Sequence, residues 1–66
     1  MQIILNGQAQ PLDTGLSLQD FILSLGLENK RYAVELNHSI VPRSRYLETP
    51  LADGDQIEII HAVGGG

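Results

Sequence analysis

The fold of this chain is decided by a stretch in its first half, residues 17–26, SLQDFILSLG. Apolar residues recur there at helical spacing and would share one helix face, namely Leu18, Phe21, Ile22 and Leu25. Ser17 is a good N-cap, and Asp20 places a carboxylate in the first turn, where it favours the helix dipole. Gly26 can take the left-handed conformation that ends a helix. The stretch therefore predicts one amphipathic helix with both ends defined.

A β-hairpin is expected before this helix. Residues 2–6 form a short apolar run, and Asn6-Gly7 is the strongest two-residue hairpin signal. The return strand, residues 8–12, contains Pro11, which cannot donate a ladder hydrogen bond and belongs on an edge strand or at a strand end. We therefore expect the second strand to lie at an edge of the sheet.

Two further strands are expected after the helix. Residues 32–36 alternate so that Val34 and Leu36 share one face, which is typical of a half-buried strand. Residues 39–41 predict a short partner strand. The segment from 42 to 51 holds two prolines and predicts an irregular crossover, with room for one short helical turn.

The last strand follows the Asp53-Gly54-Asp55 turn. Residues 56–62 are the most β-prone segment of the chain, so we expect a central strand there. A mixed sheet of about five strands packed on one helix would bury all the apolar faces. The predicted class is α+β, with one domain over residues 1–62 and a flexible glycine tail over residues 63–66.

The composition limits the chain to one small domain. At 66 residues it has room for a single core, and its 42% hydrophobic and 18% charged residues are typical of a soluble globular protein. It has no cysteine, so it can form no disulfide and offers no thiol for catalysis or metal binding. Residues 1–5 lead straight into the first strand without a signal or membrane-spanning segment, so we expect a cytoplasmic protein.

The net charge of −4 argues against nucleic acid as a partner. Only four basic residues are present, too few for the positive surface that phosphate-backbone binding needs: Lys30, Arg31, Arg43 and Arg45. An acidic surface of this size gives solubility and can steer docking onto a basic patch of another protein.

The glycine tail is the main candidate for function. The alternative is that Gly64, Gly65 and Gly66 are a disordered end, as many termini are. However, three consecutive glycines leave a backbone slim enough to thread a channel that any Cβ would obstruct. The Gly66 carboxylate, ionised because an α-carboxyl titrates at about 3.3–3.7, is a poor acyl donor until a partner enzyme activates it with a nucleotide. Gly64 and Gly65 would then thread, and Gly66 would react.

Docking residues are expected on the folded domain. If Ile57 and Ile59 face the helix, Ile4 and Ile60 project from the opposite face of the sheet as candidate docking residues, although scattered exposed isoleucines are ordinary. Arg43, with Arg45 and Tyr46, is a second candidate cluster. The alternative for this cluster is an ordinary solvated crossover.

A catalytic or metal centre is not expected. The two histidines lack further ligands nearby, and Asp53 and Asp55 lack the spaced ligands of a calcium loop, so they are interpreted as turn residues. No nucleophile or general base stands out in a chain with so little room for a cleft. We therefore expect no metal, no bound cofactor and no enzymatic activity of its own.

Several segments together match a known family pattern that spans the whole chain and its length. They are Met1-Gln2-Ile3, the Asn6-Gly7 turn, Val34-Glu35-Leu36-Asn37, Ile40-Val41-Pro42-Arg43, the Asp53-Gly54-Asp55 turn and the closing glycines. In these segments the chain resembles the ThiS family of thiamine-pathway sulfur carrier proteins. Family members commonly end in two glycines, so Gly65 and Gly66 match that motif, while Gly64 stands where another small residue is common.

The resemblance implies a ubiquitin-like β-grasp fold with the first and last strands adjacent and parallel. It also implies that an ATP-dependent, ubiquitin-activating-type enzyme adenylates Gly66, and that a sulfur-transfer enzyme and a sulfur donor then yield a thiocarboxylate. Thiazole synthase would accept that sulfur. ATP and the sulfur donor would be used by these partner enzymes and not held by this chain.

Two alternatives stay open beside this interpretation. The small subunit of molybdopterin synthase is a related sulfur carrier with the same ending, but it is usually longer and differs in its crossover. A non-covalent ubiquitin-like binding module, whose sheet face recognises a partner while the tail is idle, is the second.

Overall fold

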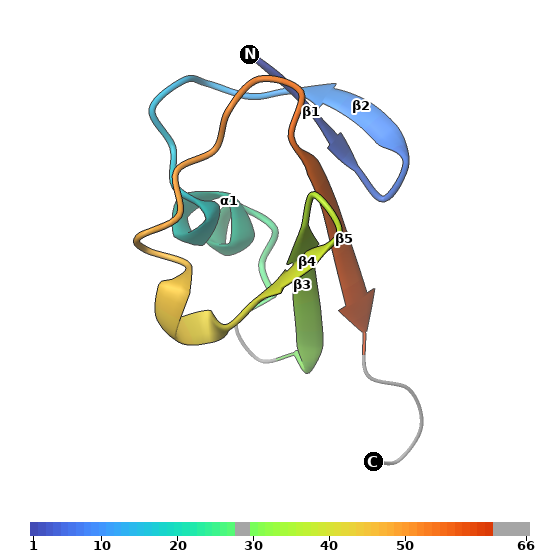
Figure 1. The fold of residues 1–66 in the computed structure, drawn as a ribbon, viewed down its shortest axis with the longest axis vertical. Coiled ribbons are helices and arrows are strands. Elements are labelled where there is room, and N and C mark those ends of the chain that lie inside the picture. The colour runs from blue at the N-terminus through green and yellow to red at the C-terminus, as the bar shows by residue number, and fades with distance from the viewer. Residues whose placement is uncertain (28–29, 62–66) are drawn as a thin grey trace.

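A computed structural model describes residues 1–27 and 30–61 of the chain. Its elements, in chain order, are β1 (Gln2–Leu5), β2 (Gln8–Pro11), α1 (Leu18–Ser24), β3 (Tyr32–Leu36), β4 (Ser39–Val41), the 3-10 turn η1 (Arg43–Arg45) and β5 (Gln56–His61). The five strands form one sheet, and α1 lies against one of its faces (Figure 1). The predicted α+β architecture is confirmed.

The sheet has the strand order β2-β1-β5-β3-β4. β1 and β5 are parallel neighbours, with Ile4 beside Gln56 and Leu5 beside Ile57. The other three pairs of neighbouring strands are antiparallel. The first and last strands therefore meet at the centre of a mixed sheet, and β2, which contains Pro11, lies at an edge as predicted.

The first hairpin is also hydrogen-bonded to the central strand β5. Asn6 and Gly7 both have positive φ, 48° and 84°, which the tight hairpin turn requires. The Asn6 side-chain oxygen accepts a hydrogen bond from the Ile59 amide at 2.9 Å, and the Asn6 amide donates to the Ile57 carbonyl at 2.9 Å. One residue therefore forms the turn and continues the pairing with β5.

Helix α1 begins with a reciprocal cap. The Ser17 hydroxyl accepts from the Asp20 amide at 3.1 Å, and the Asp20 carboxylate accepts from the Ser17 amide at 3.0 Å. Leu25 is the C-cap, and Gly26 follows with a φ of 70°. Both predicted ends are confirmed. Helix α1 has only 7 residues, and no helix in the described ranges is long and apolar enough to cross a membrane.

The crossover between β4 and β5 lies over the start of α1. The Leu18 amide donates to the Thr49 carbonyl at 2.7 Å, and the Gln19 amide donates to the Tyr46 carbonyl at 3.1 Å. These backbone bonds satisfy helix amides that have no partner within the helix. The crossover contains one short helical turn, η1, as predicted, and its backbone is held against α1.

The core lies between α1 and the inner face of the sheet. Ile57 and Ile59 point into it from β5, as predicted from the alternation along that strand. The buried residues are Ile3, Leu18, Phe21, Ile22, Val34, Tyr46, Leu51, Ile57 and Ile59. Tyr46, expected as an exposed docking residue of the crossover, is instead part of this core and only 4% exposed.

Candidate functional site

The predicted glycine site lies beyond the part of the chain that the structure describes. Gly64, Gly65 and Gly66 are outside the described ranges, as is the boundary predicted between residues 62 and 63. The described chain ends at His61, the last residue of β5, which pairs with Tyr32 at the start of β3. The tail therefore continues from the central strand of the sheet.

The face of the sheet opposite α1 carries two of the predicted docking residues. Ile57 and Ile59 point inward, so Gln56, Glu58 and Ile60 point outward along β5. Ile4 lies beside Gln56 and shares this face, about 13 Å along the strand from Ile60 at about 3.3 Å per residue. We call Ile4, Glu35, Ile40, Glu58 and Ile60 the outer face.

The outer face combines exposed apolar residues with two like charges. Ile40 is 69% exposed and Ile60 is 48% exposed. Glu35 and Glu58 stand directly opposite one another on β3 and β5. Like charges in this position destabilise a sheet, while their potential attracts a basic surface. The arrangement is suited to docking against an apolar surface that carries a cation.

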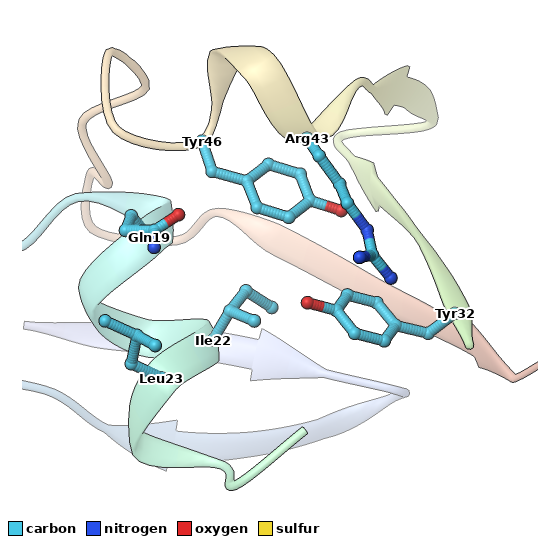
Figure 2. A pocket seen from close by; sticks show the side chains of 6 residues that line it. All are labelled: Gln19, Ile22, Leu23, Tyr32, Arg43 and Tyr46. Carbon is cyan, nitrogen blue, oxygen red and sulfur yellow. The ribbon is translucent and has the colours of Figure 1, made fainter. Parts of the chain in front are cut away.

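A second surface feature lies on the helix side of the sheet. It is a cleft of about 230 Å³, lined by Gln19, Ile22, Leu23, Tyr32, Arg43 and Tyr46 (Figure 2). Helix α1 forms one wall, the crossover another, and Tyr32 enters from β3. We call this the Arg43 cleft. Because α1 and the crossover are hydrogen-bonded to each other, the walls are held at a fixed spacing.

Arg43 lies across the ring of Tyr32. Its guanidinium carbon is 4.8 Å from the ring centroid, within the range of a cation–π contact, and one terminal nitrogen donates to the Lys30 carbonyl at 3.4 Å. Arg45, two residues later, does not line the cleft and lies 3.6 Å from the Glu48 carboxylate, with both side chains mostly exposed. The crossover therefore separates its two arginines into different environments.

Tyr46 contributes its hydroxyl to the cleft while its ring belongs to the core. In Figure 2 the hydroxyls of Tyr46 and Tyr32 both point toward the space beside Arg43. Burial raises the pKa of the Tyr46 phenol above its usual value of 10.0, and Tyr32 raises it further, while Arg43 lowers it. The phenol is therefore neutral at physiological pH and available as a hydrogen-bond donor.

The chain with Tyr46 is expected to lose stability at high pH as the phenol ionises, and the Tyr46→Phe variant should not show this loss. A raised pKa means that the folded chain holds the phenol proton more tightly than the unfolded chain does. The resulting stabilisation is complete below pH 10.0 and is lost as the pH rises through the folded-state pKa. Urea unfolding of both chains from about pH 8 to about pH 12 measures this. A difference in free energy between them that stays constant across that window would contradict the prediction.

The four predicted docking residues do not form one surface. Ile4 and Ile60 lie on the outer face, whereas Arg43 and Tyr46 lie on the helix side. The sequence interpretation missed the other residues of the cleft, which come from α1 and β3. The alternation of β3 could have identified Tyr32, because it lies two positions before the inward-facing Val34 and so shares its face of the sheet.

The acidic residues before β5 are structural, as predicted. The Asp53 carboxylate accepts from the Gln2 amide at 2.7 Å, and the Asp55 carboxylate accepts from the Ala52 amide at 2.8 Å and the Asn37 amide group at 3.0 Å. Over residues 1–27 and 30–61, no three acidic or histidine side chains gather as metal ligands would. These aspartates therefore shape the turn that leads into β5.

Comparison with known proteins gives one consistent result. A protein named sulfur carrier protein ThiS from Bacillus subtilis is 52% identical over 54 residues, which cover 82% of this chain and 80% of that protein. A crystal structure of the thiamine biosynthesis protein ThiS from Geobacter metallireducens superposes with a TM-score of 0.84 at 28% identity, covering the whole of both chains.

A longer relative contains a matching segment. A protein named thiazole synthase from Paramagnetospirillum magneticum is 33% identical over 66 residues, and the chain spans 20% of its length. The model of the ThiS family matches residues 3–66, nearly the whole sequence. Within the described residues, the parallel central pair β1 and β5 and the packing of helix α1 on the sheet agree with that match. The chain belongs to the ThiS family.

Proposed function

We propose that the chain is a sulfur carrier of thiamine biosynthesis, a protein co-substrate and not an enzyme. The observation that carries this proposal is the match to the Bacillus subtilis sulfur carrier protein, which extends over about four fifths of both chains. The family match over residues 3–66 supports it independently of any single relative. The same match favours the thiamine pathway over the related carrier of molybdopterin synthesis.

The chemistry would take place at the Gly66 carboxylate. A ubiquitin-activating-type enzyme would transfer AMP from ATP to one carboxylate oxygen, releasing pyrophosphate and creating a reactive acyl adenylate. A sulfur nucleophile at the oxidation level of hydrosulfide would then form a carbon–sulfur bond as AMP leaves, and the product would be a thiocarboxylate. Each step uses groups of the partner enzymes. The chain itself would bind neither ATP nor any other cofactor.

The folded domain would supply the docking free energy. Ordering the three glycines costs about 3–6 kcal/mol, at roughly 1–2 kcal/mol for each residue, before any contact is made. The outer face is suited to offset this cost, because Ile40 and Ile60 are exposed and the pair of glutamates attracts a basic surface. The tail would then deliver the carboxylate, while the sheet holds the partner.

Thiazole synthase is the acceptor that we propose. The Paramagnetospirillum magneticum protein of that name contains a segment that matches this entire chain and amounts to 20% of its length. A carrier-like segment within the polypeptide of its acceptor enzyme is the arrangement expected of two proteins that work together. The adenylating and sulfur-transfer enzymes are further proposed partners, and a cytoplasmic location would bring all of them together.

Intact-mass spectrometry tests the proposal directly. The chain is incubated with a ThiS-adenylating enzyme, ATP and a sulfur donor, and we expect one oxygen to be exchanged for one sulfur. Omitting ATP is the control, and it should leave the mass unchanged. An unchanged mass in the complete reaction would contradict the carrier function, and so would sulfur placed on any residue other than the C-terminal glycine.

A further inference from the structure

The Arg43 cleft has the features of a binding site that the sulfur chemistry does not use. It lies on the helix side of the sheet, whereas the outer face carries Ile4 and Ile60. We propose that the Arg43 cleft receives the carboxylate of an acidic side chain, glutamate or aspartate, from a partner protein. This inference deepens the proposed function, because a carrier must dock on each enzyme that acts on it.

The guanidinium of Arg43 is the first group that points to a carboxylate. Its cation–π contact with Tyr32, supplemented by a long hydrogen bond to the Lys30 carbonyl, places it at the cleft. Among the described residues, no carboxylate forms an ion pair with it. A planar guanidinium presents two parallel donors to a carboxylate, a geometry that a lysine cannot reproduce.

The Tyr46 hydroxyl is a second group, independent of Arg43, that points to a carboxylate ligand. The residue is 4% exposed, yet within the described ranges its hydroxyl has no hydrogen-bond partner. None of the described polar side-chain atoms is both fully buried and unpaired, so this hydroxyl reaches the open space of the cleft. A buried ring that holds an unpartnered donor at a cleft beside an arginine is suited to complete the coordination of an anion.

The apolar wall of the cleft favours a side chain over a free inorganic anion. Ile22 and Leu23 line the side that faces the polar groups, and Leu23 is 48% exposed. Methylene groups of a glutamate would lie against this wall while its carboxylate reached Arg43. A single cation also matches one negative charge better than the two charges of phosphate.

A partner protein is the source that the shape favours. The cleft is open and its volume of about 230 Å³ suits one side chain. A free carboxylate is expected to bind the cleft only weakly, because it pays the full entropy of association for few contacts, whereas a side chain on an already docked surface does not pay that cost again.

An NMR titration of the intact chain tests the site. The probe is glutamate capped at its amino and α-carboxyl groups, compared with capped glutamine and with inorganic phosphate at matched ionic strength. We expect saturable shifts at the Arg43 guanidinium and the Tyr46 ring with the glutamate probe, and about tenfold weaker binding of the glutamine probe. Equal binding of the two capped residues, tighter binding of phosphate, or no saturable shift would overturn the inference.

Two arginine variants make a matched pair for this experiment. Arg43→Gln and Arg45→Gln change the net charge equally, but only Arg43 lines the cleft, and Arg45 is 3.6 Å from Glu48. We expect Arg43→Gln to weaken binding of the glutamate probe about tenfold and Arg45→Gln to change it less than about twofold. An equal loss in both variants would mean that the probe senses only net charge, which would also overturn the inference.

The same pair tests whether the ligand belongs to a partner protein. In the adenylation and thiazole synthase reactions, Arg43→Gln should raise the KM for the carrier about tenfold in at least one reaction while leaving kcat unchanged, and Arg45→Gln should do neither. Equal KM values for both variants in both reactions would overturn the partner assignment. Because the titration needs neither enzyme nor ATP, a failure of the cleft is distinguishable from a failure of the sulfur chemistry.

Discussion

A chain that lacks Gly65 and Gly66 is expected to accept no sulfur at all. The deletion shortens the maximum reach of the terminal carboxylate by about 7 Å, at about 3.3 Å for each fully extended residue. Adenylation requires the carboxylate oxygen to reach the α-phosphate of ATP at bonding geometry, and a displacement of several ångströms removes that geometry completely. The measurement is intact mass after incubation with the adenylating enzyme, ATP and a sulfur donor.

The shortened chain also provides its own control. Both deleted residues lie beyond β5, which ends at His61, so the thermal unfolding midpoint should be unchanged. The outer face is retained, so the shortened chain should compete with the full-length chain for the adenylating enzyme. Sulfur loading of the shortened chain would contradict the proposed chemistry. If the shortened chain kept full biological activity, the alternative of a non-covalent binding module would be favoured.

The elements of the fold could be predicted because their boundaries are encoded locally. Asn6 and Gly7 adopt the positive φ values of a tight turn, and Ser17 and Asp20 form the reciprocal cap at the start of α1. Gly26 follows the helix with a φ of 70°. Each signal involves residues within one turn of each other, so no knowledge of the tertiary structure was needed.

The Arg43 cleft could not be predicted because its residues are distant in the sequence. Its walls come from α1, β3 and the crossover, and only the packing of these elements brings Gln19, Tyr32 and Arg43 together. The burial of Tyr46 also could not be predicted from the local sequence. Its local sequence indicates a solvated crossover, but backbone bonds from the start of α1 to the crossover draw its ring into the core.

The outer face was predicted more successfully, because strand alternation has a period of two. Once Ile57 and Ile59 are assigned to the core, Ile60 must face away from α1. The pairing of Glu35 with Glu58 was not predicted, since it depends on the register between β3 and β5. Register across a sheet is set by pairing and not by either strand alone.

The fold itself is expected to be most sensitive at Phe21. Its side chain is 1% exposed and projects from α1 into a core that also contains Ile3, Val34 and Ile57. Phe21→Ala leaves a cavity and is expected to cost about 3–5 kcal/mol. A chain of 66 residues has a total stability of about 3–10 kcal/mol at 0.05–0.15 kcal/mol for each residue. The variant should therefore lose much or all of its cooperative folding.

Leu23→Ala is the matched control for this prediction, because Leu23 is on the same short helix but is 48% exposed. Alanine is the best helix former, so the expected loss is about 1 kcal/mol or less. Phe21→Leu fills most of the cavity, so its loss of unfolding free energy should lie between those of Phe21→Ala and Leu23→Ala. Urea unfolding of all three variants gives the order of these losses directly.

Since the chain has no cysteine and so no disulfide, the core beneath α1 must supply most of the stability. A loss at Phe21 no larger than that at Leu23 would show that the helix contributes little to that core.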